Sequence, residues 1–222
     1  MGGGTILLAI IASILDTAYI VPLHATVQLI SSSTRLILFF KSIKWKIIFF
    51  FIIGVLPGAF LGIYVFKLLD KNIIKLLMGV FILSIIYLPK SKKESTSSFV
   101  SFLPIGFVSG LIGIFFGAIG PFIAPFFVRK DVIKEELVAT KATCQAITHI
   151  IKIPLFGFIG ANVLVHWNIL LYLCLAVIVG TIAGKNMLSK ISDTTFKKIF
   201  NVVLTIIALR IIILQLIHFL KL

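Results

Sequence analysis

Two long stretches of this sequence carry no charged side chain, and they restrict its fold more than any other feature does. Residues 47–66 and residues 153–184 contain no Lys, Arg, Asp or Glu. A helix needs about 20 apolar residues to cross a bilayer, and only helices or closed barrels satisfy their backbone polar groups there. The short alternating strands of a membrane barrel are not seen. The sequence therefore predicts an all-α polytopic membrane protein.

The composition supports this class and excludes a nucleic-acid-binding domain. The chain is 60% hydrophobic and 13% charged, whereas soluble domains are about 45–50% apolar and about 25% charged. Its net charge is +14, but the basic residues form short clusters between apolar runs, which is typical of loops facing anionic lipid. We therefore predict a lipid bilayer as partner and no nucleic acid. The clusters are Lys41, Lys44, Lys46; Lys90, Lys92, Lys93; Arg129, Lys130; and Lys197, Lys198.

An internal repeat divides the chain. Residues 24–35 and 141–152 share an ordered Ala-Thr-x-Gln and end on a basic residue, at a constant offset of 117. Later matches pair Trp45, Gly58 and Gly62 with Trp167, Gly180 and Gly184 at an offset of 122, which indicates a five-residue insertion in the second half. We predict two homologous membrane repeats, 1–89 and 99–222, joined by a basic linker at 90–98. The first repeat lacks a counterpart of 99–116, so we expect the chain to start within it.

The charge distribution predicts how the repeats are oriented. The apolar stretch 99–128 is interrupted by glycines, so it is either one long broken span or a re-entrant hairpin. A hairpin places most loop Lys and Arg on one side, whereas a crossing divides them almost evenly, and the positive-inside rule favours the hairpin. Each repeat then has a broken segment plus three crossings, and an odd number makes the repeats inverted. The expected crossings are 18–40, 47–66, 73–89, 137–159, 168–186 and 199–220.

The breaks in the apolar segments are the first candidate site. Gly117 and Gly120 allow a tight turn, and Pro121 suits the first position of a new helix. Free N–H groups at such a helix start can bind an anion. The same offset places Gly3 and Gly4 at the corresponding point of the first repeat. The alternative is that these glycines only allow helices to pack closely.

Polar side chains within the predicted spans form the second candidate site. Thr26 and Gln28 in the first repeat, and Thr143, Gln145 and His149 in the second, recur at helical spacing. Such groups are costly in a bilayer unless they pair or line a wet cavity. We predict that they border one central cavity; hydrogen bonding between helices alone is the alternative. Any pH dependence of transport is expected to arise at His149.

Basic residues within spans are the third signal. We expect Arg35 and Lys152 to snorkel to opposite membrane faces. Arg210 lies far from either end of its span, and an ionisable residue at that depth is a functional candidate. No acidic residue lies within any predicted span to neutralise it. A buried cation without a carboxylate indicates an anionic substrate.

The pattern of glycines and prolines resembles the sulfite exporter TauE/SafE family, also called the toluene sulfonate uptake permease family. The matching motifs are Gly54-x-x-Pro57-Gly58-Ala59-x-x-Gly62 and Gly110-x-x-Gly113-x-x-x-Gly117-x-x-Gly120-Pro121. The resemblance implies a multi-pass permease of the bacterial inner (plasma) membrane for sulfur-containing anions such as sulfite or sulfonates. It leaves the substrate, the direction of transport and homo-oligomer formation open.

These observations together predict a transporter for a small anion. The alternatives are a truncated family member or membrane scaffold that does not transport, and an intramembrane enzyme. No Gly-x-Ser-x-Gly, His-Glu-x-x-His or paired intramembrane aspartate motif is present, so an enzyme is disfavoured. We predict no catalytic residue, no cofactor and no metal site.

The hairpin topology is testable by labelling. Single cysteines replacing Ser97 and Lys134 should both react with a membrane-impermeant thiol reagent from the cytoplasmic side, because the stretch between them returns to the side it entered. Reaction from opposite sides would contradict the hairpin and leave parallel repeats.

Overall fold

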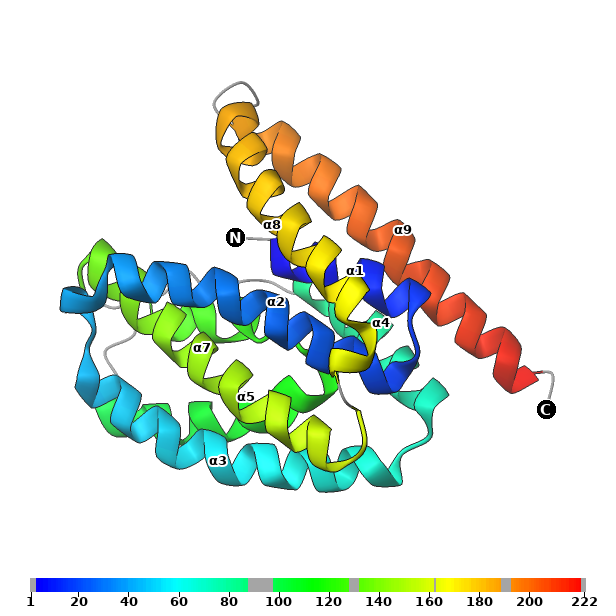
Figure 1. Cartoon of the computed structure of the whole chain (residues 1–222), viewed down its shortest axis with the longest axis horizontal. Coiled ribbons are helices and arrows are strands. Elements are labelled where there is room, and N and C mark those ends of the chain that lie inside the picture. Colours follow the sequence, from blue (N-terminus) through cyan, green and yellow to red (C-terminus); the bar gives the residue numbers. More distant parts are fainter. Residues whose placement is uncertain (1–2, 88–97, 128–131, 162, 189–192, 221–222) are drawn as a thin grey trace.

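The computed structural model describes residues 3–87, 98–127, 132–161, 163–188 and 193–220, and the regular secondary structure of this part of the chain is all helical, without a strand. Figure 1 shows the arrangement. The α-helices are α1 Gly3–Ile14, α2 Thr17–Leu38, α3 Trp45–Leu68, α4 Lys71–Tyr87, α5 Phe102–Phe116, α6 Gly120–Ile123, α7 Lys134–Phe158, α8 Trp167–Leu188 and α9 Asp193–Leu220. Short 3-10 turns are η1 Phe40–Ser42, η2 Phe99–Ser101, η3 Ala124–Phe127 and η4 Val163–His166.

The predicted crossings coincide with six of these helices, α2, α3, α4, α7, α8 and α9, to within a few residues. Within the described residues, three helices are long and apolar enough to cross a membrane: Trp45–Leu68, Phe99–Phe116 and Lys198–Leu220. α2 and α7 have 22 and 25 residues and the length to cross, but they carry the polar side chains described below. The all-helical membrane class is thus confirmed, whereas the relation of the two repeats by an in-plane two-fold axis stays a prediction. Most of the predicted linker, 90–97, lies outside the described residues.

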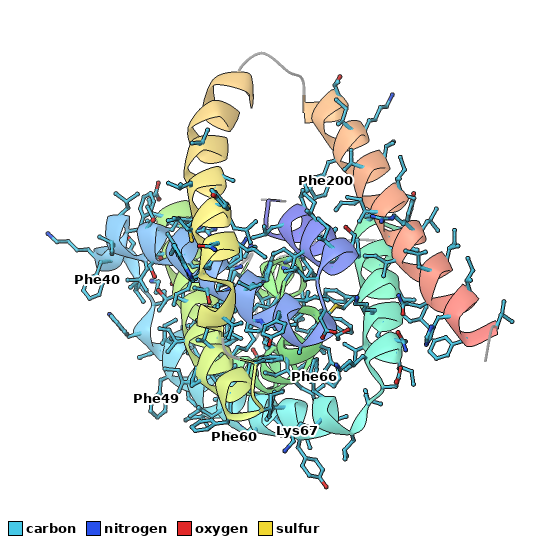
Figure 2. All side chains as sticks on the ribbon, turned by 45° about the vertical axis from the view of Figure 1, so that its right-hand side comes forward. Phe40, Phe49, Phe60, Phe66, Lys67 and Phe200 are labelled. Carbon is cyan, nitrogen blue, oxygen red and sulfur yellow. The ribbon has the colours of Figure 1, made fainter. Side chains whose placement is uncertain are left out.

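The outer surface is as apolar as the class requires. Phe49, Phe60 and Tyr64 of α3 are each about three-fifths exposed, and the two phenylalanines point outward in Figure 2. Phe66 on the same helix is buried against Phe115 and Phe156, with ring centroids 5.9 and 5.1 Å away. Large apolar side chains exposed over whole helices are expected in contact with lipid, not water.

The stretch 99–127 folds back on itself. Gly117 ends α5 with a positive φ of 66°, and its N–H donates to the Gly113 carbonyl over 3.0 Å. Pro121 then lies in the first turn of α6, as predicted. At the far end the rings of Phe102 and Phe127 meet with centroids 5.1 Å apart. The segment therefore has the shape of a hairpin, and its place in a membrane stays a prediction.

The sharpest packing constraint lies between α3 and α5. A side chain at Gly54 would collide with the Leu103 carbonyl, and one at Gly58 with the Phe107 carbonyl. Gly106 in turn faces the Phe51 carbonyl. Backbone lies directly on backbone, which only glycines allow, and small residues at such contacts are characteristic of membrane helices. Helix α3 therefore holds the α5 arm of the hairpin in place.

This contact predicts a large difference between two glycine substitutions. Gly58→Ala should lower the free energy of unfolding by about 1–3 kcal/mol, because its Cβ meets backbone that cannot move aside. Gly157→Ala in α7 is the matched control, since nothing lies within 4 Å of its added Cβ. Thermal unfolding in detergent measures both, and equal midpoints for the two variants would contradict the packing.

Candidate functional site

α2 and α7 lie side by side and run in opposite directions (Figure 1), and they present polar side chains to each other. Residues three or four apart share one face of a helix, and both helices carry polar residues at that spacing. The rings of His24 and His149 meet edge to face with centroids 6.1 Å apart. Further along, Arg35 is close enough to Lys141 for their charges to interact. We call the following residues the polar seam: His24, Gln28, Ser32, Arg35, Lys141, Gln145, His149 and Lys152.

Lys152 is the most deeply buried charge of the seam, with no exposed surface. Its Nζ donates to the carbonyl of Gly117 over 2.9 Å and to that of Gly113 over 3.4 Å. These carbonyls end α5, where the helix dipole favours a cation. The prediction that Lys152 snorkels to a membrane face is wrong, because the break at Gly117 leaves carbonyl partners in the interior. Within the described chain no carboxylate contacts this ammonium.

His24 connects the break at Gly117 with the first turn of α1, which contains Gly4. Its Nε2 lies 2.9 Å from the carbonyl oxygen of Gly4, which can only accept, so Nε2 donates. Its ring also lies against Gly117, where an added Cβ would stand 3.0 Å from Nδ1. The Nδ1 atoms of His24 and His149 are both buried without a hydrogen-bond partner in the described chain. Two histidines, not His149 alone, therefore lie at the centre of the site.

Two glutamines lie against glycines, one on α2 and one on α7. An added Cβ at Gly4 would stand 2.8 Å from Nε2 of Gln28, and one at Gly120 would stand 2.6 Å from Nε2 of Gln145. The Oε1 of Gln145 is buried and has no partner in the described chain. This oxygen can only accept a hydrogen bond, so the donors that the amide offers are on its Nε2, which lies against Gly120. The sequence predicted that Gln28, Gln145, Thr143 and the break at Gly120 border one central cavity. The structure places each glutamine against a glycine, and the shared cavity stays a prediction.

Arg35 and Lys141 occupy the other end of the seam. The guanidinium of Arg35 folds back along α2, where Nε donates to the Ser31 carbonyl over 3.2 Å and Nη2 to Oγ of Ser32 over 3.4 Å. Lys141 is 6% exposed and Ser32 is fully buried. The charge of Arg35 also acts on His149. The basic side chains thus follow one another along the seam, from Lys152 through the histidines to Arg35 and Lys141.

Some predicted site residues lie elsewhere. Gly3 is exposed, with nothing within 4 Å of an added Cβ. Thr143 is buried, but its hydroxyl donates to the Ala139 carbonyl of its own helix. The hydroxyl of Thr26 likewise donates to Pro22 O. Thr26 lines a separate apolar cavity of about 380 Å³ beside Pro154.

The burial predicted for Arg210 is wrong. Its side chain is exposed on α9. That helix packs through Leu204, Ala208 and Ile211, which are buried, and Arg210 lies outside this row. The N-terminus of α6 also contributes less to anion binding than expected at the break around Gly120. This helix has only four residues, and a single turn has a small dipole.

The fold and the seam define a helical membrane protein with buried basic side chains beside the backbone break at Gly117. The family model described as Sulfite exporter TauE/SafE matches residues 1–211. The chain belongs to this family, which comprises membrane transporters and not enzymes. No curated protein and no solved structure matches the chain.

The contact between Gly120 and Gln145 predicts a pairwise coupling. Gly120→Ala should destabilise the wild-type chain by about 1 kcal/mol, because the new methyl group displaces the glutamine amide. The same substitution in a Gln145→Ala background should cost nothing, since the obstructing amide is gone. Thermal unfolding of the four chains forms a double-mutant cycle. Gly157→Ala, whose added methyl group meets nothing within 4 Å, should change the free energy of unfolding equally in both backgrounds. Additive effects of the Gly120 and Gln145 substitutions would contradict the contact between these two residues.

Proposed function

We propose that this protein is a multi-pass transporter of the bacterial inner membrane that carries a small sulfur-containing anion, such as sulfite or a sulfonate, past the polar seam. The observation that carries this proposal is the burial of Lys152 without a carboxylate partner in the described chain. Backbone carbonyls offset part of the cost of burying an ammonium, which is several kcal/mol in the absence of full charge compensation. A transported anion would supply the missing charge.

The surroundings of Lys152 support an oxyanion in particular. An ammonium has three N–H donors, and Lys152 uses two of them on α5. The amides of Gln28 and Gln145 add further donors beside the breaks, by their positions against Gly4 and Gly120. An anion with several oxygens can accept from donors on different sides at once. A cation would meet a site already occupied by positive charge.

The absence of a carboxylate in the seam favours transport without proton coupling. Proton-driven carriers use intramembrane Asp, Glu or His to take up the proton, and within the described seam only His24 and His149 are of these types. A negative cell interior favours outward movement of an anion by about 2.3 kcal/mol per charge per 100 mV. We therefore propose export driven by the membrane potential, with any pH dependence arising at the two histidines.

Flux in proteoliposomes tests this function. Wild-type protein should release entrapped radiolabelled sulfite faster when the lumen is made negative, and Lys152→Met should reduce the rate about tenfold to a hundredfold, as expected for losing a charge-assisted contact of about 1.5–3 kcal/mol. Lys67→Met is the matched control, because Lys67 is exposed at the end of α3 and points outward (Figure 2). Wild-type liposomes that release no more sulfite than empty ones, or undiminished flux in Lys152→Met, would contradict the proposal.

A further inference from the structure

The internal repeat relates the two ends of the polar seam. At the offset of 117, His24 corresponds to Lys141 and Arg35 corresponds to Lys152. One end of the seam combines His24 with Lys152, whose charge acts on the buried imidazole. The other combines Lys141 with Arg35. Each end therefore takes the first basic residue of one repeat and the last of the other, so exchanging the repeats converts one pair into the other.

The correspondence extends to the neighbouring polar group. Ser32 occupies the position of His149 in the repeat, and each lies beside the charged pair at its own end. The Ser32 hydroxyl is fully buried and contacts the Arg35 guanidinium, just as His149 is buried within reach of the Lys152 charge. Two corresponding polar clusters, His24–His149–Lys152 and Lys141–Ser32–Arg35, thus lie along one pair of helices.

We propose that Arg35, Lys141 and Ser32 form a second binding station for the same oxyanion, so that the α2–α7 seam holds one anion at each of two stations at saturation and the substrate passes from one to the other. This inference rests on the proposed function, because it extends the first station to a passage. Arg35 has no ion pair in the described chain, and its Nη1 makes no hydrogen bond there. Lys141, whose side chain is buried, lies close enough to Arg35 for their charges to interact, so an anion bound to Arg35 would also be attracted by Lys141.

The chemistry of Arg35 fits an anion with at least two oxygens. A guanidinium presents five N–H donors in a planar fork that matches a carboxylate or another oxyanion. Two of its nitrogens are held on α2 by Ser31 and Ser32, which orients the fork. Arg35 also acts electrostatically on His149, so the two stations are neighbours. Transport requires sites that bind the ion tightly enough for entry and weakly enough for release. Two adjacent stations of moderate affinity meet this requirement.

Equilibrium binding of radiolabelled sulfite to the detergent-solubilised full chain tests the second station. Wild-type protein should bind two anions per chain, and Arg35→Met should bind one. Arg35→Lys, which keeps the charge but loses the fork, should keep the second site with about tenfold weaker affinity. Ser32→Ala removes only the hydroxyl and should weaken the same site by a few-fold. Lys67→Met, which changes an exposed cation on α3, should still bind two.

The outcomes separate this inference from the proposed function. A wild-type chain that binds one anion, or an Arg35→Met chain that binds two, overturns the second station and leaves the first intact. A wild-type chain that binds none overturns the proposed function itself. Thermal unfolding of each variant identifies any chain that has lost its fold. If Arg35→Met is such a chain, the affinity of Arg35→Lys for the second anion decides whether the station exists, since this variant retains the charge and the contacts of the aliphatic part of the side chain.

Discussion

The placement of one ammonium at the end of one helix determines how the centre of this protein is organised. Lys152 of α7 reaches the carbonyls of Gly113 and Gly117, where α5 stops. This contact ties the longest polar helix to the hairpin and brings a positive charge to the break. It also explains why α5 can end in the interior, because terminal carbonyls buried without partners would be costly. The histidines and glutamines around the break then face a cation that protein groups satisfy only in part.

Glycines have two separate roles in this arrangement. Gly54, Gly58 and Gly106 let α3 and α5 approach backbone to backbone, and side chains there would meet main-chain atoms. Gly4 and Gly120 instead leave room for the ends of flexible glutamine side chains. The first set determines whether the protein folds, and the second determines what its interior can accommodate. Glycines therefore allow close helix packing between α3 and α5, and they make room for polar side chains beside α1 and α6.

The features predicted from sequence are those that depend on local pattern. Uncharged runs identified the helices, and the recurring Ala-Thr-x-Gln identified the faces of α2 and α7 that meet. The burial of Lys152 could not be predicted, because its carbonyl partners come from a helix more than 30 residues earlier in the chain. Spacing from Gln28 could have indicated His24, which lies one turn earlier on the same face. Arg210 shows the opposite error: depth along a span does not reveal which side of the helix is packed.

The contact between α3 and α5 limits the motions available to the protein. Carbonyls of α5 lie in the gaps left by successive glycines of α3. Sliding one helix along the other would therefore require the two helices first to separate. The two helices must therefore move as one body. The junction of α7 with α2 is instead formed by side chains, such as the rings of His24 and His149. The row of basic side chains therefore lies along a boundary that is free of this backbone constraint.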